Sequence, residues 1–121
     1  KKEFDPAAVE VLKAAVTSSK DVEISDQDIT DRMMLPMIIE SSRCLEDRIV
    51  ASPVEVDLGL IYGLGFPPFR GGALAYADAM GLADVCGRAE KFKALGKLYE
   101  PTAQMQTLAK SGQKFYSGMG V

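Results

Sequence analysis

One stretch of this sequence combines glycines, prolines, aromatic rings and an arginine in a pattern that could serve a ligand. It reads YGLGFPPFRGG over residues 62–72. A glycine-rich loop can cradle a phosphate, but the dinucleotide fingerprint needs a preceding strand and a third glycine three residues after Gly65, where this chain has Pro68. Pro67 and Pro68 also lack amide donors. A nucleotide cradle is therefore disfavoured, and a rigid aromatic loop that packs against a neighbour is the simpler interpretation.

Tyr62 is the side chain in this stretch best suited to a substrate. It joins an apolar ring to a hydroxyl that can donate or accept a hydrogen bond. Such a side chain suits an acyl chain or a pantetheine arm. A tyrosine at a helix end is also commonly a half-buried core residue, and the residues alone leave both interpretations open.

Several kinds of chemistry are excluded because the chain has no histidine. Histidine is the usual proton carrier at neutral pH and the commonest metal ligand, so no Ser-His-Asp or Cys-His system can be built from this chain alone. Cys44 and Cys86 lack CxxC spacing. We expect reduced, buried cysteines, with a disulfide as the alternative. The acidic residues from Asp21 to Asp31 do not fit the spacing of a calcium loop and are better explained by helix capping, so no metal site is predicted.

The composition is that of one packed domain. The chain has 121 residues, of which 47% are hydrophobic and 26% charged. No apolar run approaches the roughly 18 residues of a membrane span, and the opening residues form no signal peptide, so we expect a soluble, cytoplasmic piece of a longer chain. A net charge of −3 offers no footprint for nucleic acid. Residues 1–60 carry −6 and residues 61–121 carry +3. This asymmetry fits a solvated surface, or a basic half that faces an anionic ligand or partner.

Helix punctuation predicts an all-α fold, a compact bundle of about five or six helices. Capping residues and prolines set the predicted starts, and glycines set the ends. The predicted starts are Pro6 after Asp5, the residue after Ser25, Pro53 after Ser52, Ala73, Leu82 and Pro101, and the predicted ends are Gly63, Gly81, Gly96 and Gly112.

The central helix, which follows Ser25, is apolar almost all round between Met33 and Ile39. We expect burial on several of its sides, and a kink at Pro36 because proline cannot donate to residue 32. The tail from Phe115 onward is expected to be extended or frayed. Helical spacing predicts the following core residues in the later helices: Val54, Leu58 and Ile61; Leu82, Val85, Cys86, Ala89 and Phe92; and Met105, Leu108 and Ala109.

Three ordered motifs carry a resemblance to a known family. They are DRMMLP at residues 31–36, RCLED at residues 43–47 and YGLGFPPFRGGAL at residues 62–74. Together with shorter matches, they resemble the C-terminal end of the bacterial fatty-acid oxidation complex alpha subunit over nearly all of residues 25–117. That family joins enoyl-CoA hydratase and NAD-dependent 3-hydroxyacyl-CoA dehydrogenase activities, with lyase and isomerase steps in one chain.

The resemblance implies a place for this segment in the longer enzyme. Residues 25–121 look like the second of two related helical domains that follow a dinucleotide-binding domain. The residues themselves, rather than the resemblance, predict an N-terminal helix and linker over residues 1–24. NAD and the family's His-Glu dyad belong to the preceding domain, so no cofactor is expected here. The resemblance also implies acyl-CoA as substrate and a thiolase beta subunit as partner.

Two departures indicate a copy without catalytic residues of its own. Asp31 stands where the catalytic copy has an asparagine. The catalytic copy closes with a Gly-Lys-Gly-Phe-Tyr turn, where this chain has GQKFY at residues 112–116. The resemblance assigns substrate contact to Tyr62 alone. The fragment by itself is therefore expected to be inactive. The alternative is a free-standing helical module for protein interaction or dimerisation, and the isolated piece could form a homodimer.

Overall fold

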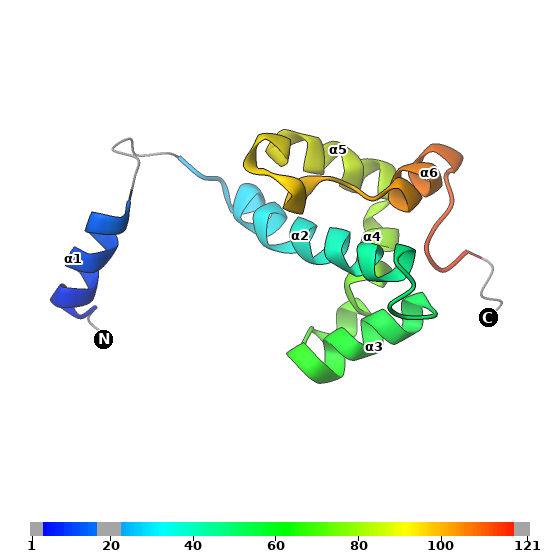
Figure 1. Cartoon of the computed structure of the whole chain (residues 1–121), viewed down its shortest axis with the longest axis horizontal. Helices are drawn as coiled ribbons and strands as arrows, with labels where there is room; N and C mark the ends of the chain where they lie inside the picture. Colours follow the sequence, from blue (N-terminus) through cyan, green and yellow to red (C-terminus); the bar gives the residue numbers. More distant parts are fainter. Residues whose placement is uncertain (1–3, 17–22, 118–121) are drawn as a thin grey trace.

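The computed structural model describes residues 4–16 and 23–117, and no strand occurs in these two ranges (Figure 1). The all-α prediction is therefore confirmed. The helices α2 to α6 pack together, with three short 3₁₀ turns between them. The elements are α1 (Pro6–Ala15), α2 (Asp26–Glu46), α3 (Pro53–Leu64), η1 (Pro68–Arg70), α4 (Ala73–Met80), α5 (Leu82–Phe92), η2 (Lys93–Leu95), η3 (Lys97–Tyr99) and α6 (Ala103–Ser111).

The predicted N-caps of the first three helices are confirmed. The Asp5 carboxylate accepts from the Ala7 amide at 2.9 Å, and Ser25 Oγ accepts from the Asp28 amide at 3.1 Å. Ser52 Oγ accepts from the Glu55 amide at 3.4 Å. These side chains satisfy amide donors that a helix leaves free at its start. Helix α1 buries none of its residues, and the predicted linker after it lies outside the described residues.

Two predicted helix boundaries are wrong. Helix α3 continues past Gly63 to Leu64, because the left-handed conformation that ends it is adopted by Gly65, with φ 74°. Helix α6 begins at Ala103 rather than at Pro101, because the Thr102 hydroxyl caps it by accepting from the Met105 amide at 3.1 Å. The predicted ends at Gly81 and Gly112 are confirmed. The helix predicted to run from Leu82 to Gly96 is α-helical only to Phe92, and Gly96 ends the 3₁₀ turn η2 that follows it.

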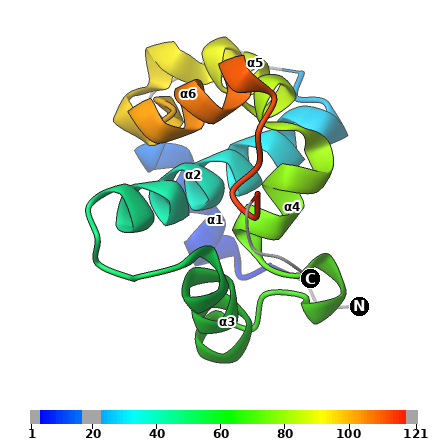
Figure 2. The ribbon, with the colours of Figure 1, turned by 90° about the vertical axis from the view of Figure 1, so that its right-hand side faces the viewer.

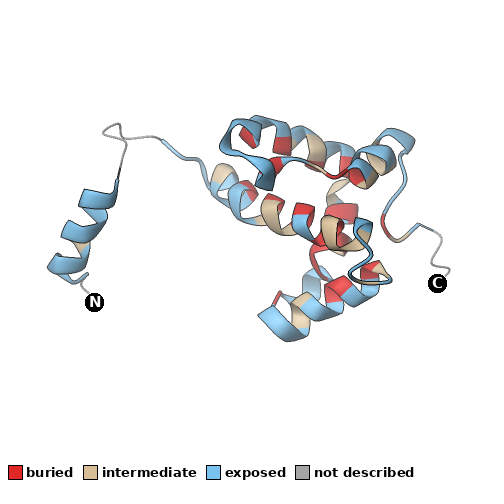
Figure 3. Ribbon diagram, viewed as in Figure 1, coloured by how far each residue is buried: buried red, intermediate tan, exposed pale blue. Residues whose placement is uncertain are grey.

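Helix α2 is the centre of the bundle and contacts α3, α4, α5 and α6. Figure 3 shows buried residues on the sides of α2, α4 and α5 that face one another. Leu35, Ile38 and Ile39 of α2 are almost fully buried. Met33 is 70% exposed, so the expected burial on several sides does not extend to this residue.

The predicted core face of α3 is wrong for two of its three residues. Val54 and Leu58 are exposed and Ile61 is half-buried against the core, whereas Val56 and the carboxylate of Asp57 are buried. The apolar residues of α3 are distributed all round the helix, so their spacing did not single out one buried face. Asp57 instead determines which face of α3 turns toward the core. Its carboxylate oxygens accept from the amides of Leu74 and Ala75, at the start of α4, at 2.9 and 3.0 Å. In α5, burial of Leu82, Val85, Ala89 and Phe92 confirms the prediction for these four residues, whereas Cys86 is only half-buried.

Pro36 lies within α2, and the helix continues through it. Since proline has no amide proton, the Arg32 carbonyl four residues earlier loses its helical donor. The Tyr99 hydroxyl takes that place and donates to the Arg32 oxygen at 3.3 Å. Tyr99 is buried in η3, and its ring centroid lies 5.5 Å from that of Phe92. Tyr99, which is distant in the sequence, thus supplies the hydrogen-bond donor that Pro36 lacks.

The segment after α6 is pinned to the bundle. Phe115 is buried, and the amides of Phe115 and Tyr116 donate to the Asp78 carboxylate at 2.9 and 3.1 Å. The Tyr116 hydroxyl donates to Asp57 at 2.7 Å. Figure 2 shows this segment running back across α4. The expectation of an extended or frayed tail is therefore wrong for Phe115–Ser117, and residues 118–121 lie outside the described part.

Candidate functional site

The connection between α3 and α4 holds the glycine-rich stretch in a fixed shape. Phe66 is buried, and its amide donates to the Leu60 carbonyl at 3.0 Å. The turn η1 follows, in which the Arg70 amide donates to the Pro67 carbonyl at 3.0 Å. A helix rather than a strand precedes the stretch, so the exclusion of a nucleotide cradle stands. These hydrogen bonds give the loop a defined shape, in agreement with the rigid loop that the sequence predicts, and its packing against a neighbour stays a prediction.

Gly72 shows why the end of this loop requires glycine. It is buried with φ 107°, and a Cβ atom built on it would lie 2.2 Å from the Asp57 side chain. No side chain fits at that distance. The close approach lets Asp57 reach the first amides of α4, where a carboxylate also complements the positive end of the helix. Asp57 therefore fixes the exit of the loop.

The outer face of the loop is apolar and open. Tyr62 is 85% exposed, Phe69 is 83% exposed and Leu64 is 74% exposed. The interpretation of Tyr62 as a half-buried core residue is therefore wrong for this chain. Monomeric proteins rarely leave several large apolar side chains together in water. These exposed side chains make the loop a candidate for contact with a ligand or a neighbouring domain.

An apolar groove of about 570 Å³ lies between α2 and α3 and reaches the same end of α3. Leu64 belongs to both the groove and the loop, whereas Tyr62 lies outside the groove lining. Two acidic residues, Glu40 and Glu55, are its charged members. The groove is lined by Met33, Pro36, Met37, Glu40, Ser41, Cys44, Ile49, Val50, Glu55, Val56, Gly59, Leu60 and Leu64.

The groove was missed at the level of sequence, although a signal for it exists. Met33, Pro36, Met37, Glu40 and Cys44 recur at helical spacing on α2 and form a second stripe beside the buried one. A helix that is apolar almost all round can be buried on all sides or can present a second face. The sequence does not distinguish these two arrangements.

Asp31 stands at the position that the resemblance associates with catalysis, and its carboxylate is already engaged in hydrogen bonds within the domain. Asp31 is buried, and its Oδ1 accepts from Gln27 Nε2 at 2.8 Å and from Arg88 Nη1 at 3.2 Å. Arg88 also donates to Asp84 at 2.9 Å, and these two acids raise the pKa of Arg88. Asp31 therefore joins α2 to α5 through an ion pair.

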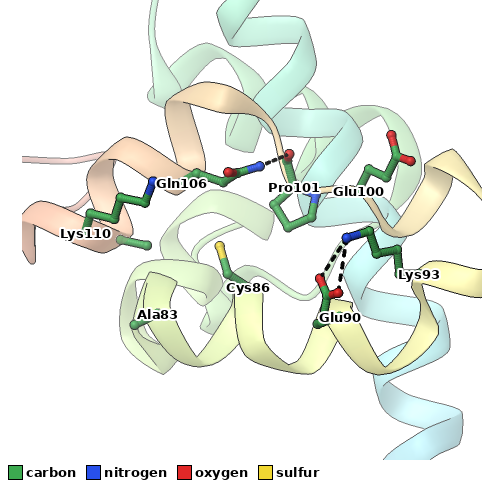
Figure 4. Close-up of a pocket in the computed structure, with 9 residues that line it drawn as sticks. Ala83, Cys86, Glu90, Lys93, Glu100, Pro101, Gln106 and Lys110 are labelled. Carbon is green, nitrogen blue, oxygen red and sulfur yellow. Dashed lines mark hydrogen bonds and ion pairs between the residues drawn. The ribbon is translucent and has the colours of Figure 1, made fainter.

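A second pocket, of about 550 Å³, lies between α5 and α6 (Figure 4). Cys86 lines it, and burial raises the pKa of the Cys86 thiol, so the thiol is protonated at neutral pH and is a poor nucleophile. Lys93 in this pocket is paired with Glu90 at 3.1 Å. Cys44 and Cys86 are both free and half-buried. This arrangement offers no covalent chemistry.

The described residues contain neither a cluster of metal-ligating side chains nor a helix that could span a membrane. Within residues 4–16 and 23–117, no three Cys, Asp or Glu side chains are grouped to hold a metal ion. Over the same ranges, no helix is both long enough and apolar enough to cross a bilayer. The exposed loop after α3, with Tyr62 and the adjoining groove, is thus the candidate functional site.

Comparison with known proteins gives a consistent result over the whole fold. The family described as 3-hydroxyacyl-CoA dehydrogenase, C-terminal domain, matches residues 29–117. A fatty acid oxidation complex subunit alpha from Pseudomonas aeruginosa is 53% identical over 96% of this chain, and one from Pseudomonas syringae is 50% identical over the same share. The chain spans only 16% of the length of each of these relatives. The chain belongs to the 3-hydroxyacyl-CoA dehydrogenase C-terminal domain family.

Proposed function

We propose that this chain is the second helical domain of a longer, multifunctional fatty-acid β-oxidation enzyme. In that enzyme it supports the catalytic helical domain and lines the acyl-CoA site without catalysing a step itself. Residues 25–121 form the domain, and residues 1–24 are the helix and linker that lead into it. The nicotinamide cofactor, bound by a preceding domain, would accept the hydride from the 3-hydroxyl carbon, and a His-Glu pair outside this chain would handle the proton.

The observation that carries the proposal is the exposure of Tyr62 on a rigid loop. The fold holds the Tyr62 ring in water at the end of α3, where solvent exposure of an aromatic surface brings no stability. Both the ring and the hydroxyl are available to the thioester arm of an acyl-CoA. Because the loop is anchored by Phe66 and Gly72, Tyr62 would meet this substrate without rearrangement.

The groove beside the loop supports a second part of the proposal, the packing of this domain against the preceding helical domain. Its apolar lining, which includes the exposed side chains of Met33 and Leu64, leaves a surface that another helix can cover. In an isolated chain the same surface would favour a homodimer. A thiolase beta subunit remains a proposed partner of the whole enzyme, which we place in the cytoplasm.

The occupied carboxylate of Asp31 supports the absence of catalysis by this domain. A catalytic group must reach the reacting atoms, whereas Asp31 is buried and tied to Arg88 and Gln27. The pocket between α5 and α6 offers a protonated thiol in place of a reactive one. We therefore expect the chain alone to oxidise no hydroxyacyl thioester.

The test is steady-state kinetics of the full-length enzyme with Tyr62→Ala. The change should raise the KM for 3-hydroxyacyl-CoA about tenfold, or about 1.4 kcal/mol, and leave hydratase turnover unchanged. Tyr62→Phe removes only the hydroxyl, so it separates the contribution of the hydroxyl to substrate binding from that of the ring. Leu95→Ala, at another exposed apolar residue on η2, is the control and should change neither activity. Dehydrogenase kinetics that stay the same in Tyr62→Ala would refute the role of Tyr62.

A further inference from the structure

Arg70 stands out among the charged residues near the candidate site. It is the only basic residue between Arg48 and Arg88, so α3, η1 and α4 together carry a single cation. It lies in η1, eight residues after Tyr62 on the same rigid connection, which Figure 2 shows at the periphery of the bundle. The side chain is exposed.

Two aromatic rings hold the guanidinium group of Arg70. Its Cζ lies 5.5 Å from the centroid of the Phe69 ring and 5.3 Å from that of Tyr76. Contacts at these distances attract a cation to the ring faces and restrict its motion. Because neither contact is a hydrogen bond to a polar acceptor, the N–H donors of the guanidinium remain available.

No acid neutralises this cation in the described part of the chain. The ion pairs there include Arg43 with Glu40, and Arg88 with Asp31 and Asp84, but none includes Arg70. No hydrogen bond from the Arg70 side chain is formed within the same residues either. A planar donor fork that is held in place without an acceptor is suited to a phosphate, which it can bind through two parallel hydrogen bonds.

We propose that Arg70 binds a phosphate of the nucleotide end of the acyl-CoA substrate. This inference rests on the proposed function, because it needs the thioester arm to pass Tyr62. A CoA ester carries its phosphates at the end remote from the acyl group, so one ligand can meet an aromatic contact and then a cation. Arg70 is then a residue of substrate binding and specificity, and it takes no part in hydride transfer.

The test compares three thioesters of the same 3-hydroxyacyl group in the full-length enzyme: the CoA ester, the 3′-dephospho-CoA ester and the pantetheine ester, which has no nucleotide. Arg70→Ala should raise the KM for the CoA ester about tenfold and leave kcat unchanged. The KM for the pantetheine ester should be the same in the unsubstituted enzyme and in Arg70→Ala. Arg70→Lys keeps the charge without the planar fork, so its KM for the CoA ester should lie between those of the other two enzymes.

The dephospho ester identifies the phosphate. If Arg70 binds the ribose phosphate, Arg70→Ala has no effect on this ester, and if it binds the pyrophosphate, the full effect remains. An unchanged KM for the CoA ester would overturn the proposal. An equal loss with all three thioesters would overturn it as well, because it would show that Arg70 only packs against another domain. Tyr62→Ala in the same assays should weaken the binding of all three esters, so failure of the proposed function is seen separately.

Discussion

Replacing Asp57 with asparagine should lower the free energy of unfolding by about 3 kcal/mol. The carboxylate is 1% exposed and accepts three hydrogen bonds, from the amides of Leu74 and Ala75 and from the hydroxyl of Tyr116. An asparagine has the same shape but only one acceptor oxygen. Its NH₂ group would turn a donor toward the Leu74 amide if it replaced Oδ1, or toward both the Ala75 amide and the Tyr116 hydroxyl if it replaced Oδ2.

The magnitude follows from two contributions. Leaving one buried amide without an acceptor costs about 1–3 kcal/mol. Removing the negative charge from the positive end of α4 costs about 0.3–1 kcal/mol more, and up to about 2 kcal/mol when the site is partly buried. Tyr116→Phe removes only the hydroxyl donor and should cost about 1–2 kcal/mol. Because Asp57 and Tyr116 share a hydrogen bond, the two losses should add to more than the loss in the double variant.

Urea denaturation of the 121-residue chain, followed by far-ultraviolet circular dichroism, measures these changes. Asp47→Asn is the matched control, because it makes the same chemical change at an exposed residue that caps the end of α2. It should stay within about 0.5 kcal/mol of the parent chain. If Asp57→Asn falls within that range too, or if its effect and that of Tyr116→Phe simply add, the assigned role of this carboxylate is wrong.

Three further predictions concern single features of the fold. Tyr99→Phe should lower the free energy of unfolding, measured by urea denaturation, by about 1 kcal/mol. In a Pro36→Ala background it should lower it by almost nothing, because the restored amide donates to the Arg32 carbonyl, and equal losses in the two backgrounds would refute this. Arg48→Gly should raise the free energy of unfolding by about 1 kcal/mol because Arg48 has φ 57° after α2, and a loss in the same assay would contradict it. Burial and the Asp57 carboxylate raise the pKa of Tyr116 in the folded chain above its ordinary value of 10.0. Above pH 10 the unfolded chain therefore binds fewer protons at this residue, and the stability measured against pH should fall more steeply than in Tyr116→Phe, whereas parallel curves would exclude the effect.

Local chemistry explains which parts of the fold the sequence could predict. Ser25 and Ser52 cap helices through amides three residues away, so the evidence for those starts lies within one turn. The inward face of α3 depends on Asp57 and on partners 17 to 59 residues away in the sequence. Hydrophobic spacing alone therefore selected Val54 and Leu58, which the structure places at the surface.

The candidate site was predictable to a similar degree. The glycines and prolines of residues 62–72 indicate a rigid loop, and the resemblance selects Tyr62. The exposure of Tyr62 and the two rings beside Arg70 depend on how α3 and α4 pack, which no local pattern determines. Sequence reasoning therefore found the segment but missed its second candidate binding residue.

The central claim is that this domain serves a dehydrogenase whose reacting groups lie elsewhere in a longer chain. The most direct measurement adds the purified 121-residue chain to a full-length enzyme shortened to end before this domain, and follows oxidation of a 3-hydroxyacyl-CoA by NAD⁺. We predict that the mixture recovers dehydrogenase activity while each component alone has almost none. Oxidation by the 121-residue chain alone, or a mixture no more active than the shortened enzyme, would contradict the claim, and the second result would favour a free-standing interaction module.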